Sequence, residues 1–210
     1  MIEVLLADDH TIFRKGLTEV LQRDADIVVA GEAADGAATL ELLRQRSFDV
    51  VVLDIQMPGR GGLEVLKDIC RLYPKTGVLI LSMHPVEQYA IRAIRAGALG
   101  YLTKERTPYE LIGAIREVAA GRRYVDDALA RQLAEEIGVG GQGPPHERLS
   151  DRELRVMLEL ARGKTVREIA DELCLSVNTV STYRARILSK MHLRNSAEIA
   201  YYAVKEGLVE

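Results

Sequence analysis

The sequence predicts an α/β protein: a doubly wound, five-stranded parallel sheet followed by a small all-α unit of four helices. Three observations predict it. From residue 1 to about 123, short apolar runs alternate with amphipathic helical patterns, which is typical of a parallel sheet covered by helices. A stretch rich in Gly and Pro at residues 138–145 then interrupts regular structure. Beyond it, capping signatures mark several helices and no strand pattern is evident.

The predicted strands are short and mainly aliphatic, as strands buried on both faces of a parallel sheet are. They are Ile2–Ala7, Ile27–Gly31, Val50–Leu53, Val78–Leu81 and Gly100–Leu102. Helical patterns follow them over Thr11–Arg23, Asp35–Arg46, Leu63–Ile69, Pro85–Ala96 and from Thr107 onward. The last begins with a capping Thr107, a proline and Glu110 three residues past the cap, which is a strong start signal. This alternation implies a doubly wound parallel sheet.

The patterns divide the chain into a domain at residues 1–123, a connecting segment at 124–148 and a second domain at 149–210. The connecting segment contains a helical pattern over Asp127–Ile137 and the Gly/Pro-rich linker Gly138–Pro145. The expected helices of the second domain are Asp151–Ala161, Val166–Leu173, Val177–Met191 and Ser196–Glu206. The turn Cys174-Leu175-Ser176 joins the second of these helices to the third, which is the spacing of a helix-turn-helix.

Composition favours a water-soluble protein. Of the 210 residues, 48% are hydrophobic and 28% are charged, so sizeable cores can form. No apolar stretch approaches the roughly 20 residues of a membrane span, and the N-terminus lacks the pattern of a secretion signal. We therefore expect a cytoplasmic protein with no membrane partner. Cys70 and Cys174 lie far apart within helical patterns and are expected to be reduced packing residues.

Charge is unevenly distributed along the chain. The formal net charge of the whole chain is −3, which gives no sign of nucleic-acid binding. Between Ser176 and Arg194, however, four basic residues and no acidic ones give a local charge of +4 with histidine neutral. A basic helix is often only a solvated face. Here the preceding turn and the small polar residues at the start of the helix favour contact with DNA phosphates and bases.

Carboxylates follow two of the predicted strands. Asp8 and Asp9 come directly after the first strand, and Asp54 comes directly after the third. If these strands are neighbours, the carboxylates converge at the C-terminal edge of the sheet, where open α/β folds bind ligands. Ionised carboxylates at such short distances repel one another unless a proton or a cation is bound. Mg²⁺ is a suitable cation because it prefers oxygen ligands. Asp54 is then a candidate phosphoryl acceptor; the alternative is that the three residues only cap loops.

Two further side chains are expected at the same edge. Ser82 ends the fourth strand, and Lys104 follows the fifth strand by two residues. Singly, such residues are usually just solvated. Together, a hydroxyl, an ammonium and Mg²⁺ are what a phosphoryl group on Asp54 would need, because each can contact one of its oxygens.

These residues carry a resemblance to a known family. Asp8-Asp9, Asp54 with Met57-Pro58-Gly59 behind it, Ser82 and the run from Ala98 to Lys104 closely resemble the receiver domain of bacterial two-component response regulators. The resemblance implies a flavodoxin-like fold and phosphoryl transfer to Asp54 from a partner sensor histidine kinase. It also implies Mg²⁺ as the cofactor. The implied ligands are Asp9, Asp54, the backbone oxygen of Gln56 and, largely through water, Asp8.

The same resemblance assigns a switch. Ser82 and Tyr101 match a pair in which the hydroxyl moves towards the phosphoryl group and the aromatic ring turns inward. The alternative for Tyr101 is an ordinary half-buried aromatic residue on a strand. Lys104 and Ser82 would serve Asp54 in phosphoryl transfer.

The C-terminal domain resembles the LuxR-type helix-turn-helix. The matching residues are Leu149–Glu153, Glu168-Ile169-Ala170, Leu175-Ser176, Thr179-Val180 and Lys190-Met191. With the receiver ahead of it, the chain is similar to NarL/FixJ-family response regulators, most of all to the GacA/UvrY group. The implied DNA contacts are to phosphates, from Thr179, Arg184, Arg186 and Lys190, and towards bases, from Ser181, Thr182 and Ala185. The implied dimer contact is made by Ile199, Tyr202 and Ala203.

These features together predict a DNA-binding transcriptional response regulator. A partner histidine kinase would phosphorylate Asp54 and so control homodimerisation and binding to double-stranded promoter DNA. We expect no enzymatic activity beyond the receiver's own phosphoryl transfer and dephosphorylation. One alternative is a regulator that binds DNA independently of phosphorylation. Another is an aspartyl-phosphate phosphatase of the haloacid-dehalogenase type, although such enzymes typically have a second aspartate where this chain has Gln56.

Overall fold

The computed structural model describes residues 1–84, 86–127, 129–131 and 144–209. The chain divides into two compact units, Met1–Ala134 and Glu135–Glu210, and each has its own buried apolar core. The predicted domain limits at residues 123 and 149 stay a prediction. Among the described helices, none has the length and apolar character needed to cross a membrane.

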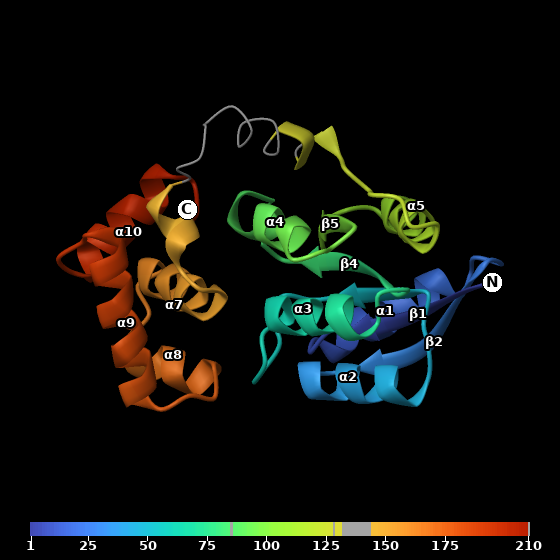
Figure 1. Cartoon of the computed structure of the whole chain (residues 1–210), viewed down its shortest axis with the longest axis horizontal. Coiled ribbons are helices and arrows are strands. Elements are labelled where there is room, and N and C mark those ends of the chain that lie inside the picture. The colour runs from blue at the N-terminus through green and yellow to red at the C-terminus, as the bar shows by residue number, and fades with distance from the viewer. Residues whose placement is uncertain (85, 128, 132–143, 210) are drawn as a thin grey trace. The chain divides into compact units, whose positions relative to one another are not determined.

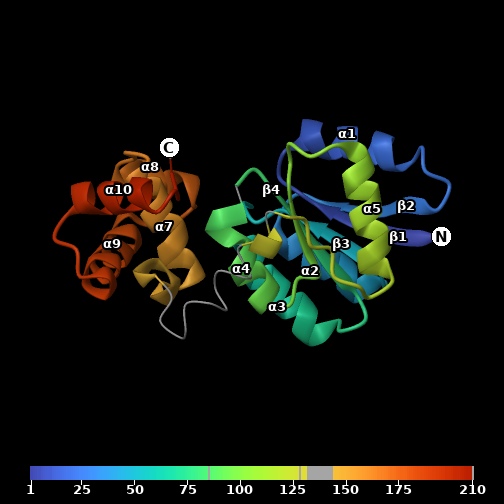
Figure 2. The same cartoon turned by 90° about the horizontal axis from the view of Figure 1, so that it is seen from above.

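The first unit is a five-stranded sheet whose neighbouring strands are all parallel, in the order β2-β1-β3-β4-β5. Its strands are β1 (Ile2–Ala7), β2 (Ile27–Ala33), β3 (Val50–Leu53), β4 (Gly77–Ser82) and β5 (Gly100–Thr103). Its helices are α1 (Thr11–Leu21), α2 (Gly36–Gln45), α3 (Gly62–Leu72), α4 (Val86–Arg95) and α5 (Pro108–Ala119). Figures 1 and 2 show the alternation of strand and helix, with α1 and α5 on one face of the sheet and α2, α3 and α4 on the other. The predicted doubly wound sheet is confirmed.

The neighbouring pair β1 and β3 positions the site. Ala7 lies opposite Leu53, and the pairing continues one residue further, because the backbone N–H of Asp54 donates to the carbonyl of Ala7 at 2.8 Å. Every residue of β3 is buried, as its β-branched composition predicts for a central parallel strand. The strand order reverses between these two strands, and their C-terminal ends meet there.

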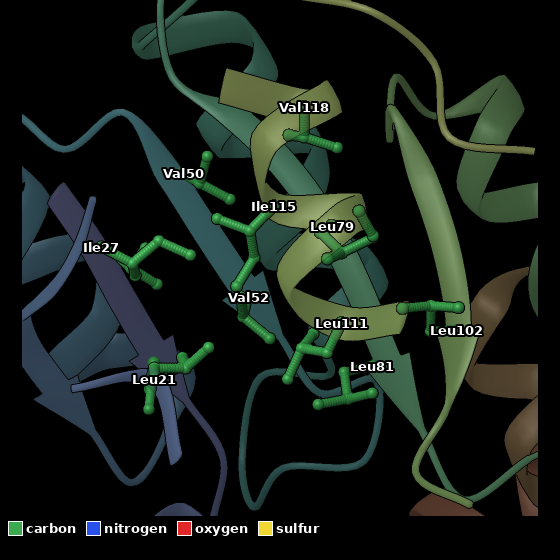
Figure 3. Close-up of a cluster of buried hydrophobic side chains, with 13 residues drawn as sticks. Leu21, Ile27, Val50, Val52, Leu79, Leu81, Leu102, Leu111, Ile115 and Val118 are labelled. Carbon is green, nitrogen blue, oxygen red and sulfur yellow. The ribbon is translucent and has the colours of Figure 1, made fainter. Parts of the chain in front are cut away.

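The core of this unit lies between the sheet and the pair α1 and α5. Figure 3 shows Ile115 and Val118 of α5 pointing towards Val50, Val52 and Leu79 of the sheet. Their side chains are all at most 3% exposed, so the interior is closely packed against this helix. The capping box predicted at Thr107 and Glu110 is present and fixes the start of α5.

The bounds of several elements differ from the prediction by one to three residues. β2 extends to Ala33 rather than Gly31, because Glu32 and Ala33 pair with the end of β1. Most helices are a residue or two shorter than predicted, since terminal residues such as Asp35 serve as caps instead. The helical pattern predicted at residues 127–137 is helical at 127 and 129–131, and the remainder lies outside the described residues, as does linker segment 138–143.

The second unit is helical, as predicted. A short 3₁₀ helix, η1 (Pro145–Arg148), precedes α7 (Asp151–Ala161), α8 (Val166–Glu172), α9 (Val177–Met191) and α10 (Ser196–Lys205). Capping boxes begin α7 and α8, and Ser176 caps α9 by accepting from the backbone N–H of Thr179. In the turn between α8 and α9, Cys174 is exposed and has a φ of 53°, so the prediction that it is a packing residue is wrong. A short turn, unlike a helix interior, leaves that side chain in solvent.

Candidate functional site

Three aspartates meet at the C-terminal ends of β1 and β3. Carboxylate oxygens of Asp8, Asp9 and Asp54 and a ring nitrogen of His10 all lie within 4.8 Å of one another. Asp8 and Asp54 are buried, whereas Asp9 and His10 lie at the exposed rim. The predicted convergence of the three carboxylates is therefore present, and it follows from the direct pairing of their two strands.

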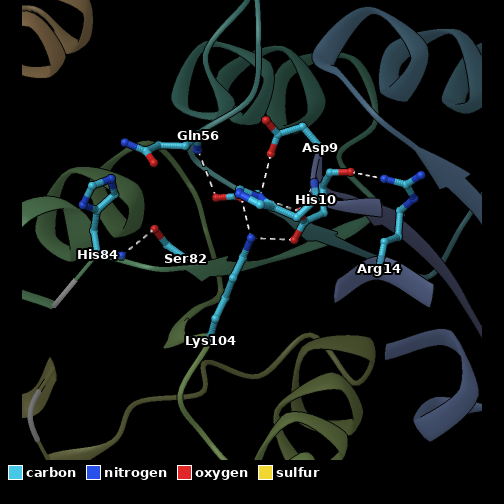
Figure 4. Close-up of polar contacts among 9 residues, drawn as sticks. Asp9, His10, Arg14, Gln56, Ser82, His84 and Lys104 are labelled. Atoms are coloured by element: carbon cyan, nitrogen blue, oxygen red, sulfur yellow. Dashed lines mark hydrogen bonds and ion pairs between the residues drawn. The ribbon is translucent and has the colours of Figure 1, made fainter. Parts of the chain in front are cut away.

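His10 is a member of this cluster that the sequence-based prediction missed. Its Nδ1 atom lies 2.9 Å from Asp9 and 3.3 Å from Asp8, and its backbone N–H donates to the Asp8 carboxylate at 2.8 Å. The available signal was its position directly after Asp8-Asp9, since histidine is itself a common metal ligand. Figure 4 shows the contact between the imidazole of His10 and the carboxylate of Asp9.

Lys104 reaches into the acidic cluster from the loop after β5. Its Nζ atom lies 2.6 Å from a carboxylate oxygen of Asp8 and 2.6 Å from one of Asp54, and its side chain is 2% exposed. The backbone N–H of Lys104 continues the pairing of β5 with β4, donating to the carbonyl of Ser82 at 2.8 Å. The ammonium also lies 4.7 Å from the centre of the Phe13 ring. The predicted approach of a cation to Asp54 is present (Figure 4).

The Asp54 carboxylate is held in a poorly solvated place. Burial raises its pKa, and the nearby charge of Asp8 acts in the same direction. The ammonium of Lys104 and the backbone N–H of Gln56, which donates to Asp54 at 3.0 Å, oppose the shift without cancelling it. A buried carboxylate that is costly to ionise gains from any added positive charge, so this donor set of three carboxylates fits a divalent cation.

Ser82 and Tyr101 lie on adjacent strands and both contact His84. Ser82 is fully buried, and its hydroxyl accepts the backbone N–H of His84 at 3.1 Å. The hydroxyl of Tyr101 donates to the backbone carbonyl of His84 at 2.8 Å, and the ring is fully buried. Tyr101 is therefore fully buried and not half-buried, and its part in a switch stays a prediction.

The DNA-binding face predicted on α9 is largely exposed. Ser181, Thr182, Ala185 and Arg186 are exposed, and Thr179 is partly buried beside the N-cap Ser176. The other two predicted contacts have partners within the unit. The Nε of Arg184 donates to the hydroxyl of Ser196 at 2.9 Å, and Nζ of Lys190 lies 2.6 Å from the Glu153 carboxylate. Sequence spacing could not find these partners, because both lie on other helices.

The dimer contact predicted on α10 needs correction. Ile199 and Ala203 are fully buried within the second unit, and a side chain without exposed surface cannot contact another copy. Tyr202 is half-buried, and its hydroxyl lies 2.9 Å from Nδ1 of His146. The exposed apolar side chains of this helix are instead Tyr201, 74% exposed, and Val204, 55% exposed. The predicted stripe is the face that packs into the core.

The sequence matches known families over both units. Residues 4–116 match the response regulator receiver domain, and residues 147–203 match the bacterial regulatory proteins of the luxR family. The chain is 38% identical to the response regulator UvrY of Escherichia coli K12, covering 99% of this chain and 96% of UvrY. It is also 38% identical to the response regulator GacA of Pseudomonas aeruginosa, covering 100% of this chain and 99% of GacA.

Solved structures of response regulators are similar as well. RcsB from Salmonella enterica serovar Typhimurium, bound to a promoter in the presence of the phosphomimetic BeF₃⁻, gives a TM-score of 0.67 at 28% identity, covering 96% of this chain and 97% of that chain. A LuxR-family two-component response regulator from an Aurantimonas species gives a TM-score of 0.61 at 37% identity, covering 66% of this chain and 99% of that chain. The chain therefore belongs to the two-component response regulators, with a receiver domain ahead of a LuxR-type DNA-binding domain.

Proposed function

We propose that Asp54 accepts a phosphoryl group from a partner histidine kinase and that this modification controls dimerisation and promoter binding. A carboxylate oxygen of Asp54 would attack the phosphorus of a phosphohistidine, forming a P–O bond as the P–N bond breaks and the imidazole leaves. The observation that carries the proposal is the ammonium of Lys104, buried and 2.6 Å from Asp54, where it would neutralise charge on the transferred group.

Mg²⁺ is the cofactor that this donor set fits. We propose that Asp9, Asp54 and the backbone oxygen of Gln56 hold it directly and that Asp8 holds it largely through water. When bound, the ion would neutralise the carboxylates and the transferring phosphoryl group. Because Lys104 already pairs with Asp8 and Asp54, its ammonium stands where it can pass to a phosphoryl oxygen.

The proposed switch passes through the loop that follows β4. A phosphoryl group adds about −1.5 to −2 of charge, and the Ser82 hydroxyl would donate to one of its oxygens. That hydroxyl now accepts the N–H of His84, and the carbonyl of His84 accepts the hydroxyl of Tyr101. Movement of Ser82 would therefore change the backbone that holds Tyr101, which couples the phosphorylation site to the β4–α4 loop.

We propose that α9 enters the major groove of promoter DNA. Ser181, Thr182 and Ala185 would face base edges, and Arg186 with Thr179 would contact phosphates. The similar structure of RcsB bound to a promoter supports this assignment. Arg184 could join them while its Nε still donates to the Ser196 hydroxyl, because a guanidinium has four further N–H donors.

A homodimer would present two such helices to half-sites about one turn of DNA apart. We propose that its contact on α10 is the exposed face of Tyr201 and Val204 instead of the originally predicted stripe. We also propose that the protein acts in the cytoplasm, where bacterial promoters and kinase domains meet.

Labelling with acetyl phosphate and Mg²⁺, followed by mass spectrometry, tests the phosphoacceptor. We expect one phosphoryl group on the wild type and none on Asp54→Asn. Promoter affinity is then measured with and without BeF₃⁻ and Mg²⁺, and we expect tighter binding with both. Labelling without any change in affinity would favour DNA binding independent of phosphorylation. Rapid turnover of a small phosphomonoester, lost in Asp54→Asn, would favour the phosphatase alternative.

A further inference from the structure

We propose that Phe13 is a positioning residue for Lys104: its ring face holds the lysine ammonium beside the phosphoacceptor while the lysine exchanges its anionic partners. This inference rests on the proposed function of Asp54. The residue lies in the first turn of α1, far in sequence from the loop after β5, and the fold brings the two together.

The contact is a cation–π interaction in a place shielded from water. The Nζ atom of Lys104 lies 4.7 Å from the centre of the Phe13 ring, within the roughly 6 Å over which a ring face attracts a cation. The lysine side chain is only 2% exposed. Because shielding from water strengthens the attraction, this contact belongs to the stronger class of such pairs.

The ring itself is fixed by its surroundings. Phe13 is half-buried and packs against the core between the sheet, α1 and α5, as does Leu17 one turn further on. Arg14 holds the same turn against the end of β1, since its guanidinium donates to the backbone carbonyl of Asp8 and pairs with Glu32. Packing of α1 on the core therefore holds the ring face beside Lys104.

Phosphorylation would change the anionic partners of the Lys104 ammonium but not its contact with the Phe13 ring. Lys104 is paired with Asp8 and Asp54 at 2.6 Å each. A phosphoryl group on Asp54 converts one carboxylate oxygen to the bridging oxygen of an acyl phosphate, and a cation bound at the aspartates competes for both carboxylates. The attraction of the aromatic ring has no such dependence, so it keeps the ammonium from turning away before a phosphoryl oxygen is in reach.

The simpler interpretation is that Phe13 only fills the core. That role predicts a loss of stability on truncation with no specific effect on Lys104. The two roles can be separated, because Leu17 packs against the same core from the same helix and supplies a matched control.

The test uses the full chain and four proteins: wild type, Phe13→Leu, Phe13→Tyr and Leu17→Ala. NMR of selectively labelled lysine follows the ε-methylene protons of Lys104, which a nearby ring face shifts upfield. Titration with BeF₃⁻ in the presence of Mg²⁺ measures affinity for a phosphoryl mimic. We expect Phe13→Leu to lose the upfield shift and to bind BeF₃⁻ about 2- to 30-fold more weakly. Phe13→Tyr should retain both properties.

Leu17→Ala should lower the melting temperature while leaving the lysine shift and the BeF₃⁻ affinity at wild-type values. Equal affinity in wild type and Phe13→Leu, or an equal loss of affinity in Leu17→Ala, would overturn the inference while leaving the phosphoacceptor role of Asp54 intact. If the wild type neither binds BeF₃⁻ nor takes up label from acetyl phosphate, the proposed function fails, and the positioning role fails with it.

Discussion

Replacing Lys190 by methionine should weaken the second unit without changing how its DNA binding depends on salt. Lys190 was predicted to contact phosphate, but its ammonium lies 2.6 Å from Glu153, which is buried at the start of α7. Burial opposes ionisation of Glu153, but hydrogen bonds from Lys190 and from Ser150 lower its pKa overall. The lysine therefore pairs with the carboxylate of the α7 capping box and links α9 to α7.

The magnitudes follow from this geometry. A charged hydrogen bond contributes about 1.5–3 kcal/mol, but the side chain of Lys190 is 42% exposed, so solvent screening reduces the expected loss to about 1 kcal/mol. Because the pKa of Glu153 is lowered by folding, this contribution is present above the ordinary carboxyl pKa and is lost as the pH falls below it. The stabilities of wild type and Lys190→Met should converge in acid.

DNA binding supplies the matched control. Each phosphate contact contributes about −0.9 to the slope of log affinity against log salt, which is about 3- to 4-fold between roughly 50 and 200 mM salt. Arg186→Met, on the exposed face of α9, should reduce the slope by about that amount. Lys190→Met should leave it unchanged. Urea unfolding and fluorescence anisotropy at several salt concentrations measure the two effects. A reduced slope in Lys190→Met with unchanged stability would refute this reasoning.

Three further outcomes are expected. Asp54→Asn should raise the melting temperature at neutral pH, because burial makes ionisation of Asp54 unfavourable; the gain should shrink as acid protonates the wild-type carboxyl, and an unchanged difference down to low pH would contradict this. Ile115→Ala should cost about 2–5 kcal/mol in urea unfolding, since the side chain is fully buried, whereas a loss below about 1 kcal/mol would indicate a loosely packed core. Tyr201→Asp should prevent dimerisation by sedimentation in the presence of BeF₃⁻, while a persistent dimer would place the contact elsewhere.

The sequence was most informative where one strand or one cap determines the outcome. The run Val50–Leu53 could be predicted to be a central strand, because it is apolar throughout, rich in β-branched residues and too short for a helix. The proximity of Asp8 and Asp54 could be predicted from this strand, because parallel pairing of β1 and β3 brings together the residues that come directly after them. Capping boxes could also be predicted from the sequence, because the two residues of each box lie within four positions of one another.

Contacts between distant side chains could not be predicted in this way. Lys190 meets Glu153 only because α9 packs on α7 at a particular angle and rotation, and Phe13 meets Lys104 only because α1 packs beside the loop after β5. The type and spacing of a residue on one helix do not show whether its side chain contacts solvent, a ligand or another residue of the same chain. The net positive charge of α9 thus correctly indicated that the domain binds DNA. The role of each basic residue on this helix depends on the neighbouring helices.

The face of α10 illustrates the same limit for apolar residues. Ile199 and Ala203 are four residues apart, and Tyr201 and Val204 are three residues apart, so each pair lies on one face of the helix. Helical periodicity alone therefore gives two candidate apolar faces. Packing of α10 on α7 buries the first pair completely and leaves the second in solvent. A surface for a second copy must keep exposed apolar area in the single chain, because binding can gain only from area that folding has not already buried. By that criterion Tyr201 and Val204 are the large apolar side chains of this helix that the proposed dimer contact would bury.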